Sequence, residues 1–84
     1  MYKIFWERKA LKRLKKIPIK DRRFINDSVK NLANWTDIQN VKPLISHQYQ
    51  YRLRVGRYRV FFDKEESLKI LKIEEVKKRD ERTY

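Results

Sequence analysis

The sequence contains no cysteine and only one histidine, His47. Without cysteine the chain can form neither disulfide bonds nor metal sites built from thiolates. A single histidine also argues against a metal site built from clustered histidines. No metal or cofactor is therefore expected, and any chemistry must come from other side chains.

Long apolar runs are also missing, since none extends beyond a few residues. No stretch is long enough to span a membrane, and the first residues, Met-Tyr-Lys-Ile, lack the apolar segment of a secretory signal. A cytoplasmic protein is expected. The length of 84 residues predicts one domain, residues 1–84, with one modest core.

The charge of the chain is strongly one-sided, with 23 lysines and arginines against 11 aspartates and glutamates and a net charge of +12. Self-repulsion of this size destabilises a compact chain, and a polyanionic partner would relieve it. Nucleic acid, an acidic protein and an anionic membrane surface all fit that description. An aromatic content of 13% and clear periodicity argue against a disordered basic tail.

The order of the elements predicts an α+β fold. Residues 2–6 fit a short strand, and helical spacing of apolar residues follows in 7–17 and 20–34, with Pro18 between them. Segment 35–49 predicts a loop that contains Pro43 and a surface histidine, His47. Strands are predicted at 51–55, 58–62 and 68–75, with a polar turn at 63–67 and a tail at 76–84. The architecture is then an N-terminal strand, a helical hairpin and a three-stranded antiparallel meander, with the helices packed on one face of a small twisted sheet.

The two predicted helices each have an apolar inner face. The residues expected there are Ala10, Leu11, Leu14 and Ile17 in the first helix, and Phe24, Ile25, Val29 and Leu32 in the second. The outer face of the first helix is rich in lysine and arginine, Lys12 among them. Such a face is ordinary for a surface helix, and we expect at most electrostatic steering of a polyanion from it.

Arginine alternates with apolar residues in segment 51–62, Tyr-Arg-Leu-Arg-Val-Gly-Arg-Tyr-Arg-Val-Phe-Phe. This period of two predicts strands with one buried face, and it directs Arg52 and Arg54 away from that face. Gly56 is the one glycine of the chain, and it interrupts the alternation. Because glycine adopts positive φ at little cost, a tight turn is expected at Gly56-Arg57.

Four arginines without an intervening acid repel one another, which predicts an anion site, most simply for phosphate. The alternative is that they form only the solvated outer face of a hairpin. Arg52, Arg54 and Arg59 are expected to converge on the sheet face that the helices leave open. The tail adds Lys78, Arg79 and the terminal Tyr84, which could stack on an unstacked base. This set suits a single-strand RNA reader, or a nuclease that stabilises a transferring phosphoryl group with positioned cations.

Three segments make the chain resemble the RelE/ParE toxin superfamily. They are Ala-Leu-Lys-Arg-Leu-Lys-Lys at 10–16, the arginine segment 51–62, and Lys-Arg-Asp-Glu-Arg-Thr-Tyr at 78–84. The resemblance covers essentially the whole chain. It implies a toxin of a bacterial type II toxin–antitoxin pair, whose partners would be an acidic cognate antitoxin and mRNA on the ribosome.

The RelE-like branch of that superfamily is favoured by the tail tyrosine and the full arginine set. The resemblance to this branch implies metal-independent cleavage of ribosome-bound mRNA, by attack of a ribose 2′-hydroxyl on the adjacent phosphate to leave a cyclic phosphate. It assigns the basic strand positions to Arg52 and Arg54 and the arginine after the tyrosine to Arg59. The tail positions match Lys78 or Arg79, and Tyr84.

Two departures from the RelE-like pattern concern three positions. Arginines stand at 52 and 54 where lysine is usual, and arginine is a poor general base because it stays protonated. Lys78 stands where many relatives have histidine. These departures leave the general base unassigned. The alternatives are a ParE-like inhibitor of DNA gyrase, which is not a nuclease, and a basic RNA-binding module without catalysis.

Overall fold

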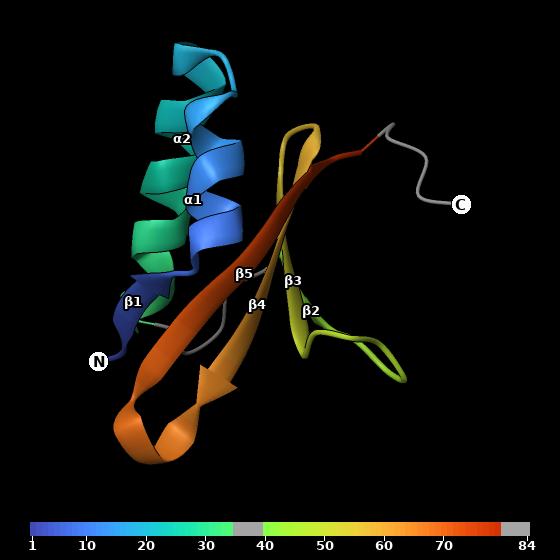
Figure 1. Ribbon diagram of the computed structural model, residues 1–84. Helices are drawn as coiled ribbons and strands as arrows, with labels where there is room; N and C mark the ends of the chain where they lie inside the picture. The colour runs from blue at the N-terminus through green and yellow to red at the C-terminus, as the bar shows by residue number, and fades with distance from the viewer. Residues whose placement is uncertain (35–39, 80–84) are drawn as a thin grey trace.

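A computed structural model describes residues 1–34 and 40–79 of the chain (Figure 1). Its helices are α1 (Arg8–Lys15) and α2 (Ile19–Asn31), and short 3-10 turns lie at Leu32–Asn34 and Glu66–Leu68. Its strands are β1 (Lys3–Trp6), β2 (Val41–Pro43), β3 (Tyr51–Val55), β4 (Tyr58–Glu65) and β5 (Ile70–Lys78). The predicted α+β fold is confirmed.

The strands form one mixed sheet in the order β1-β5-β4-β3-β2. The pairs from β2 to β5 are antiparallel, and β1 lies parallel to β5 at the opposite edge. The two helices lie side by side against one face of this sheet, on the left in Figure 1, and β2 and β3 lie to the right of β4 and β5. Helices α1 and α2 leave the other side of the sheet uncovered.

Helix α1 ends where the sequence predicts a break before Pro18, and the side chain of Arg22 closes that end. Its guanidinium donates hydrogen bonds to the carbonyl oxygens of Lys15 and Ile17, at 3.1 and 3.2 Å. These carbonyls have no partner within the helix, so an arginine from the following helix satisfies them. The contact fixes the turn between the two helices.

The inner faces of the helices agree with the prediction at most positions. Ile25, Val29 and Leu32 follow a spacing of four and three residues and are fully buried. The prediction was wrong for Phe24, whose side chain is 58% exposed. Its ring instead lies beside Gly56, at the turn between β3 and β4. Leu11 is also on the outer side, at 38% exposure.

The core lies between the helices and the covered face of the sheet. Strands β3 and β4 contribute Leu53, Val55, Val60 and Phe62, and β5 contributes Leu71, Ile73 and Val76. The turn after β3 is confirmed, since Gly56 has a φ of +55°, a conformation that favours glycine.

Three parts of the sheet differ from the sequence prediction. Strand β4 continues to Glu65, so residues 63–65, which were predicted to begin a polar turn, belong to the sheet. Val41–Pro43, predicted as loop, forms the edge strand β2 and pairs with Tyr51–Leu53. Pro43 is tolerated there because an edge strand does not need every backbone N–H. The last strand begins two residues later than predicted and continues to Lys78, so Val76 to Lys78 belong to the sheet and not to a tail. No described helix is long and apolar enough to cross a membrane.

Candidate nucleic-acid interface

Cationic side chains gather on the sheet face that the helices leave uncovered, which we call the open face. Leu53 and Val55 of β3 point into the core, so Arg52 and Arg54 between them point to the open face. Arg59 of β4 alternates in the same way between the buried residues Tyr58 and Val60. The predicted convergence of these three arginines on one face therefore agrees with the strand register.

Three cations form a row across the middle of the sheet. Arg59 on β4 is the cross-strand partner of Arg54 on β3 and of Lys77 on β5. Side chains directly opposite on neighbouring strands lie about 5 Å apart at their Cβ atoms, and like charges at that separation destabilise a sheet. An anion placed over Arg59 would lie within reach of all three and would remove this repulsion.

A second row begins at the β2 edge, where Lys42 is paired with Arg52. These two side chains, with Arg54, Asn40 and Val41, line a hollow of about 320 Å³. The Nε atom of Arg52 is buried and has no hydrogen-bond partner within the described residues. A buried donor without an acceptor is costly, and an anion in this hollow would satisfy it.

Compensating negative charge is sparse around these rows. Within residues 1–34 and 40–79, no carboxylate forms an ion pair with Arg52, Arg54 or Arg59. Glu75 takes up part of the charge of Lys77, at 3.7 Å, and it also contacts Lys9 of α1, at 3.2 Å. The arginines therefore remain available for an external anion, and Lys77 only partly so.

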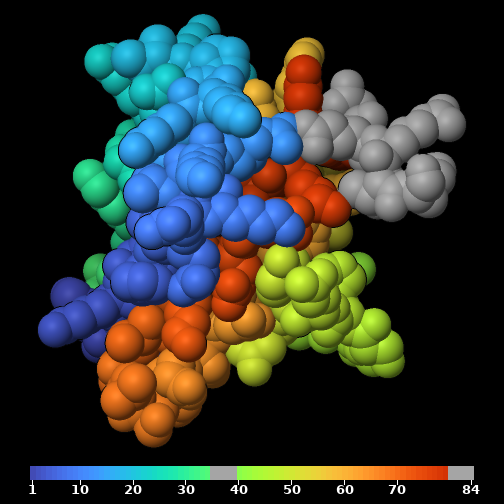
Figure 2. Space-filling view, in the orientation of Figure 1, coloured from blue at the N-terminus to red at the C-terminus, as the bar shows by residue number. Residues whose placement is uncertain are grey.

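The basic face of α1 extends the same surface around the edge of the sheet. Strand β1 pairs with β5 only up to Ile73, and beyond that point side chains of α1 reach over β5 (Figure 2). Lys9, Lys12, Arg13 and Lys16 line a hollow of about 270 Å³ there, together with Glu75 and Val76. Because these cations lie on helix exteriors, they contribute a diffuse field rather than a fixed contact.

The other predicted site residues are not all brought to this face. Lys78 is paired with Tyr58, a core residue, so its side chain leaves the sheet on the side opposite to Arg59. Arg79 is exposed and follows the strand, and its backbone N–H donates to the carbonyl oxygen of Arg57. This bond holds the start of the tail at the β3–β4 turn. Tyr84 lies outside the described residues.

Sequence reasoning missed two cations of the open face, Lys42 and Lys77. Both fall in segments that were predicted to be irregular, so no alternation could be assigned to them. The only available signal for Lys77 was its place in the run Val-Lys-Lys-Arg that continues the last strand.

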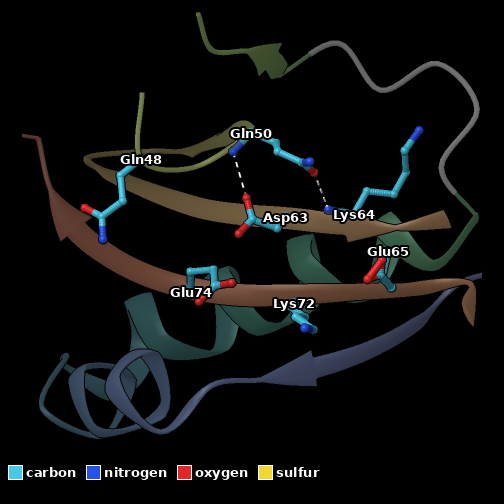
Figure 3. Close-up of a pocket in the computed structure, with 7 residues that line it drawn as sticks. All are labelled: Gln48, Gln50, Asp63, Lys64, Glu65, Lys72 and Glu74. Atoms are coloured by element: carbon cyan, nitrogen blue, oxygen red, sulfur yellow. Dashed lines mark hydrogen bonds between the residues drawn. The ribbon is translucent and has the colours of Figure 1, made fainter. Parts of the chain in front are cut away.

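The far end of the open face is acidic and polar instead. A hollow of about 320 Å³ is lined there by Gln48, Gln50, Asp63, Lys64, Glu65, Lys72 and Glu74 (Figure 3). The Gln50 backbone N–H donates to Asp63 Oδ1 at 2.8 Å, and the Lys64 N–H donates to Gln50 Oε1 at 2.7 Å. These bonds anchor the β2–β3 loop to the outer half of β4.

Glu74 and Asp63 face each other in this hollow. Burial, followed by the hydrogen bond with Asp63 and its charge, raises the pKa of the Glu74 carboxyl to about 7. A carboxyl pair of this kind repels phosphate when ionised, so the anion site is confined to the arginine end. Within the part of the chain that the structure describes, no cluster of histidine and carboxylate side chains is arranged to hold a metal ion.

The comparisons with known proteins find similarity in fold, among solved structures. No protein-family model matches the chain, and no curated protein matches it. Among solved structures, the isolated E. coli RelE toxin aligns with a TM-score of 0.81 and 18% identity, covering 99% of this chain and 88% of that one. The RelBE2 toxin–antitoxin complex of Mycobacterium tuberculosis gives 0.79 and 20%, covering 93% and 98%. The archaeal RelE–RelB complex of Pyrococcus horikoshii gives 0.76 and 22%, covering 96% and 98%.

Proposed function

We propose that this chain, which has the fold of the RelE toxins, is the toxin of a type II toxin–antitoxin pair and cleaves mRNA on the ribosome without a metal ion. The observation that carries the proposal is the row of Arg54, Arg59 and Lys77 beside Arg52. A merely solvated hairpin face has no need to line up like charges on three neighbouring strands.

The reaction that suits this face is transfer of the phosphate within the RNA. The ribose 2′-hydroxyl gives up its proton and its oxygen attacks the adjacent phosphorus. The O2′–P bond forms while the bond from phosphorus to the 5′-oxygen of the next nucleotide breaks, and that leaving oxygen takes up a proton. The products are a 2′,3′-cyclic phosphate and a 5′-hydroxyl. Negative charge grows on the non-bridging oxygens as the fifth bond forms, and preorganised cations stabilise that charge more than the ground state.

Arg59 lies in the centre of the row, so we assign stabilisation of the growing phosphate charge first to this residue. Its strand neighbours Tyr58 and Val60 are buried, which fixes the backbone from which the guanidinium extends. Arg52 and Arg54 would bind the flanking phosphate oxygens with their planar forks. Arginine remains protonated, so none of the three removes the proton from the 2′-hydroxyl. Arg79 and Tyr84 of the tail would complete the site, and Lys78 would contribute only through the general field.

An acidic antitoxin is the partner that the surface favours. The net charge of +12 fits a segment rich in aspartate and glutamate, and so do Arg52, Arg54 and Arg59, which form no ion pair within residues 1–34 and 40–79. Such a segment, ordered on binding, would cover the open face and block the entry of RNA. Two of the structurally similar chains come from complexes of this kind, the archaeal RelE–RelB complex and the toxin–antitoxin complex RelBE2.

The decisive experiment incubates the protein with a ribosome programmed by a defined mRNA and maps the ends of the fragments. We expect cyclic-phosphate and 5′-hydroxyl ends, and a single 2′-deoxynucleotide at the cut position should abolish cleavage there. Sulfur substitution of a non-bridging oxygen should slow the reaction, with no rescue when manganese replaces magnesium. A specific manganese rescue would refute the metal-independent mechanism.

The second candidate is a ParE-like inhibitor of DNA gyrase, because the resemblance in the sequence covers both branches. The same protein should therefore be tested for gyrase-trapped breaks in DNA. Intact mRNA together with such breaks would replace the nuclease proposal by gyrase inhibition. Binding of RNA without cleavage and without an effect on gyrase would leave a non-catalytic RNA-binding module.

A further inference from the structure

His47, Tyr49 and Phe61 form an aromatic cluster on the open face, between its basic and acidic ends. The His47 ring stacks on Phe61 with a centroid distance of 5.4 Å and an interplanar angle of 11°. Tyr49 lies at 5.7 Å from Phe61, tilted by 35°. Phe61 and Tyr49 are 7% and 8% exposed, whereas His47 is exposed. The cluster therefore presents one ring, that of His47, to an incoming ligand.

The backbone holds the His47 ring in one orientation. The Tyr49 N–H donates a hydrogen bond to His47 Nδ1 at 3.0 Å. The neutral ring then carries its proton on Nε2, which makes that nitrogen a donor. Because the lone pair is already used at Nδ1, His47 in this arrangement cannot accept a proton from the 2′-hydroxyl. The geometry suits binding and excludes the role of general base.

The loop that carries His47 is itself fixed to the sheet. Leu44 N–H donates to the carbonyl oxygen of Gln50 and closes the loop, and Gln50 is tied to β4 as described above. Burial and the hydrogen bond to the Glu75 carboxylate raise the pKa of Tyr49 to about 12, so its hydroxyl stays protonated and donates to Glu75. A ligand meets a platform that is already formed, which reduces the entropy lost on binding.

The platform adjoins the cations of the proposed phosphate site. Phe61 is the cross-strand partner of Arg52, and Arg59 lies two residues away on the same face of β4. A nucleotide whose phosphate contacts these arginines has its base within reach of the His47 ring. Aromatic rings that stack with unpaired bases beside a basic groove are typical of single-strand RNA recognition.

We infer that the His47–Phe61 stack is a subsite for one unpaired nucleobase next to the phosphate held by Arg52 and Arg59. Stacking on the free face of the His47 ring supplies the affinity, and because every base has an aromatic face, the contact is largely indifferent to base identity. The inference rests on the proposed RNA substrate, but it concerns binding and not the chemical step. The site thereby fixes the position of one unpaired base relative to the bound phosphate.

A binding cycle tests the subsite without cleavage. The probe is a fluorescein-labelled, 2′-O-methylated pentanucleotide, and five further versions each lack one base. Anisotropy at low salt should show that one abasic position weakens binding of the wild-type protein by about tenfold, the usual size of one stacking contact. His47→Ala should weaken binding of the intact probe to the same degree and be insensitive to that abasic position.

Two variants make the result specific. Ile45→Ala changes a 91% exposed side chain of the same loop and should bind like the wild type. His47→Phe keeps a flat ring and should restore both the affinity for the intact probe and the sensitivity to the abasic position. Wild-type binding by His47→Ala, or equal sensitivity to the abasic position in both proteins, would overturn the subsite. Thermal unfolding of each variant shows whether a loss of binding is a loss of fold.

The two proposals fail separately. If the cycle holds but ribosome-bound mRNA stays intact, the base subsite stands and the nuclease proposal falls. If mRNA is cut with cyclic-phosphate ends but His47→Ala binds the probe normally, the nuclease proposal stands and the subsite falls.

Discussion

We expect the stability of the protein to depend on pH near neutrality because of the carboxyl pair of Asp63 and Glu74. Glu74 is the extra residue of a bulge in β5, because Phe61 is paired with Glu75 whereas Phe62 is paired with Ile73. The bulge directs the Glu74 carboxyl toward Asp63. Burial, the hydrogen bond with Asp63 and the charges of Asp63 and Glu7 raise the pKa of Glu74, and Lys72 partly opposes them.

The sign of the effect follows from the direction of this shift. The folded state prefers the protonated carboxyl, so its contribution to stability is complete below the ordinary pKa of 4.5 and is lost as pH rises through about 7. A shift of this size corresponds to at most ~3 kcal/mol. Because the carboxyl remains in contact with water, solvent screening reduces the expected effect to about 1 kcal/mol.

Replacing Glu74 by glutamine tests this reasoning, since glutamine mimics the protonated acid at every pH. We expect Glu74→Gln to be more stable than the wild type by about 1 kcal/mol at pH 8, or roughly 4–8 °C in Tm for a domain of this size. The difference should vanish near pH 4.5. Urea or thermal unfolding of both proteins at the two pH values measures it. Glu65→Gln removes a charge from the same hollow and serves as the control. If the free energies of unfolding of Glu74→Gln and the wild type differed by the same amount at both pH values, the raised pKa of Glu74 would be refuted.

Two further predictions concern the arginine row and the core. Arg59→Ala should abolish growth inhibition while the protein stays folded, because loss of a preorganised contact to transition-state charge costs about 10²–10³ in rate. Lys12→Ala should remain toxic. If both substitutions weakened toxicity equally, the arginine row would be only a charged surface. Phe62→Ala removes a fully buried ring and should lower the free energy of unfolding by about 3–5 kcal/mol. Phe24→Ala, at 58% exposure, should cost much less in the same urea titration, and a similar cost would contradict the placement of the two rings.

Local sequence determined most of the elements and the central arginines. The alternation Arg52-Leu53-Arg54-Val55 has a period of two, which specifies a strand and the face on which each arginine lies. Gly56 marks the turn because its φ of +55° is unfavourable for other residues. Helical spacing identified the buried positions Ile25 and Val29. It failed at Phe24 because hydrophobicity alone does not distinguish a core ring from one that covers a turn.

The composition of the open face was decided only by tertiary structure. Val41–Pro43 is too short to be recognised as a strand and contains a proline, and it becomes a strand by pairing with β3, which places Lys42 beside Arg52. His47 is positioned by the backbone of its own loop and by Phe61, from a distant strand. Neither contact leaves a periodic signal in the sequence.

The bulge at Glu74 is the clearest case. Leu71 and Ile73 point to the core, and simple alternation would continue with residues 75 and 77 on the same side. The extra residue shifts the register by one, so Val76 fills the core and Lys77 joins Arg59 on the open face. A shift of one residue reverses the face of every later side chain in a strand. The third cation of the row therefore exists only because of how β5 pairs with β4.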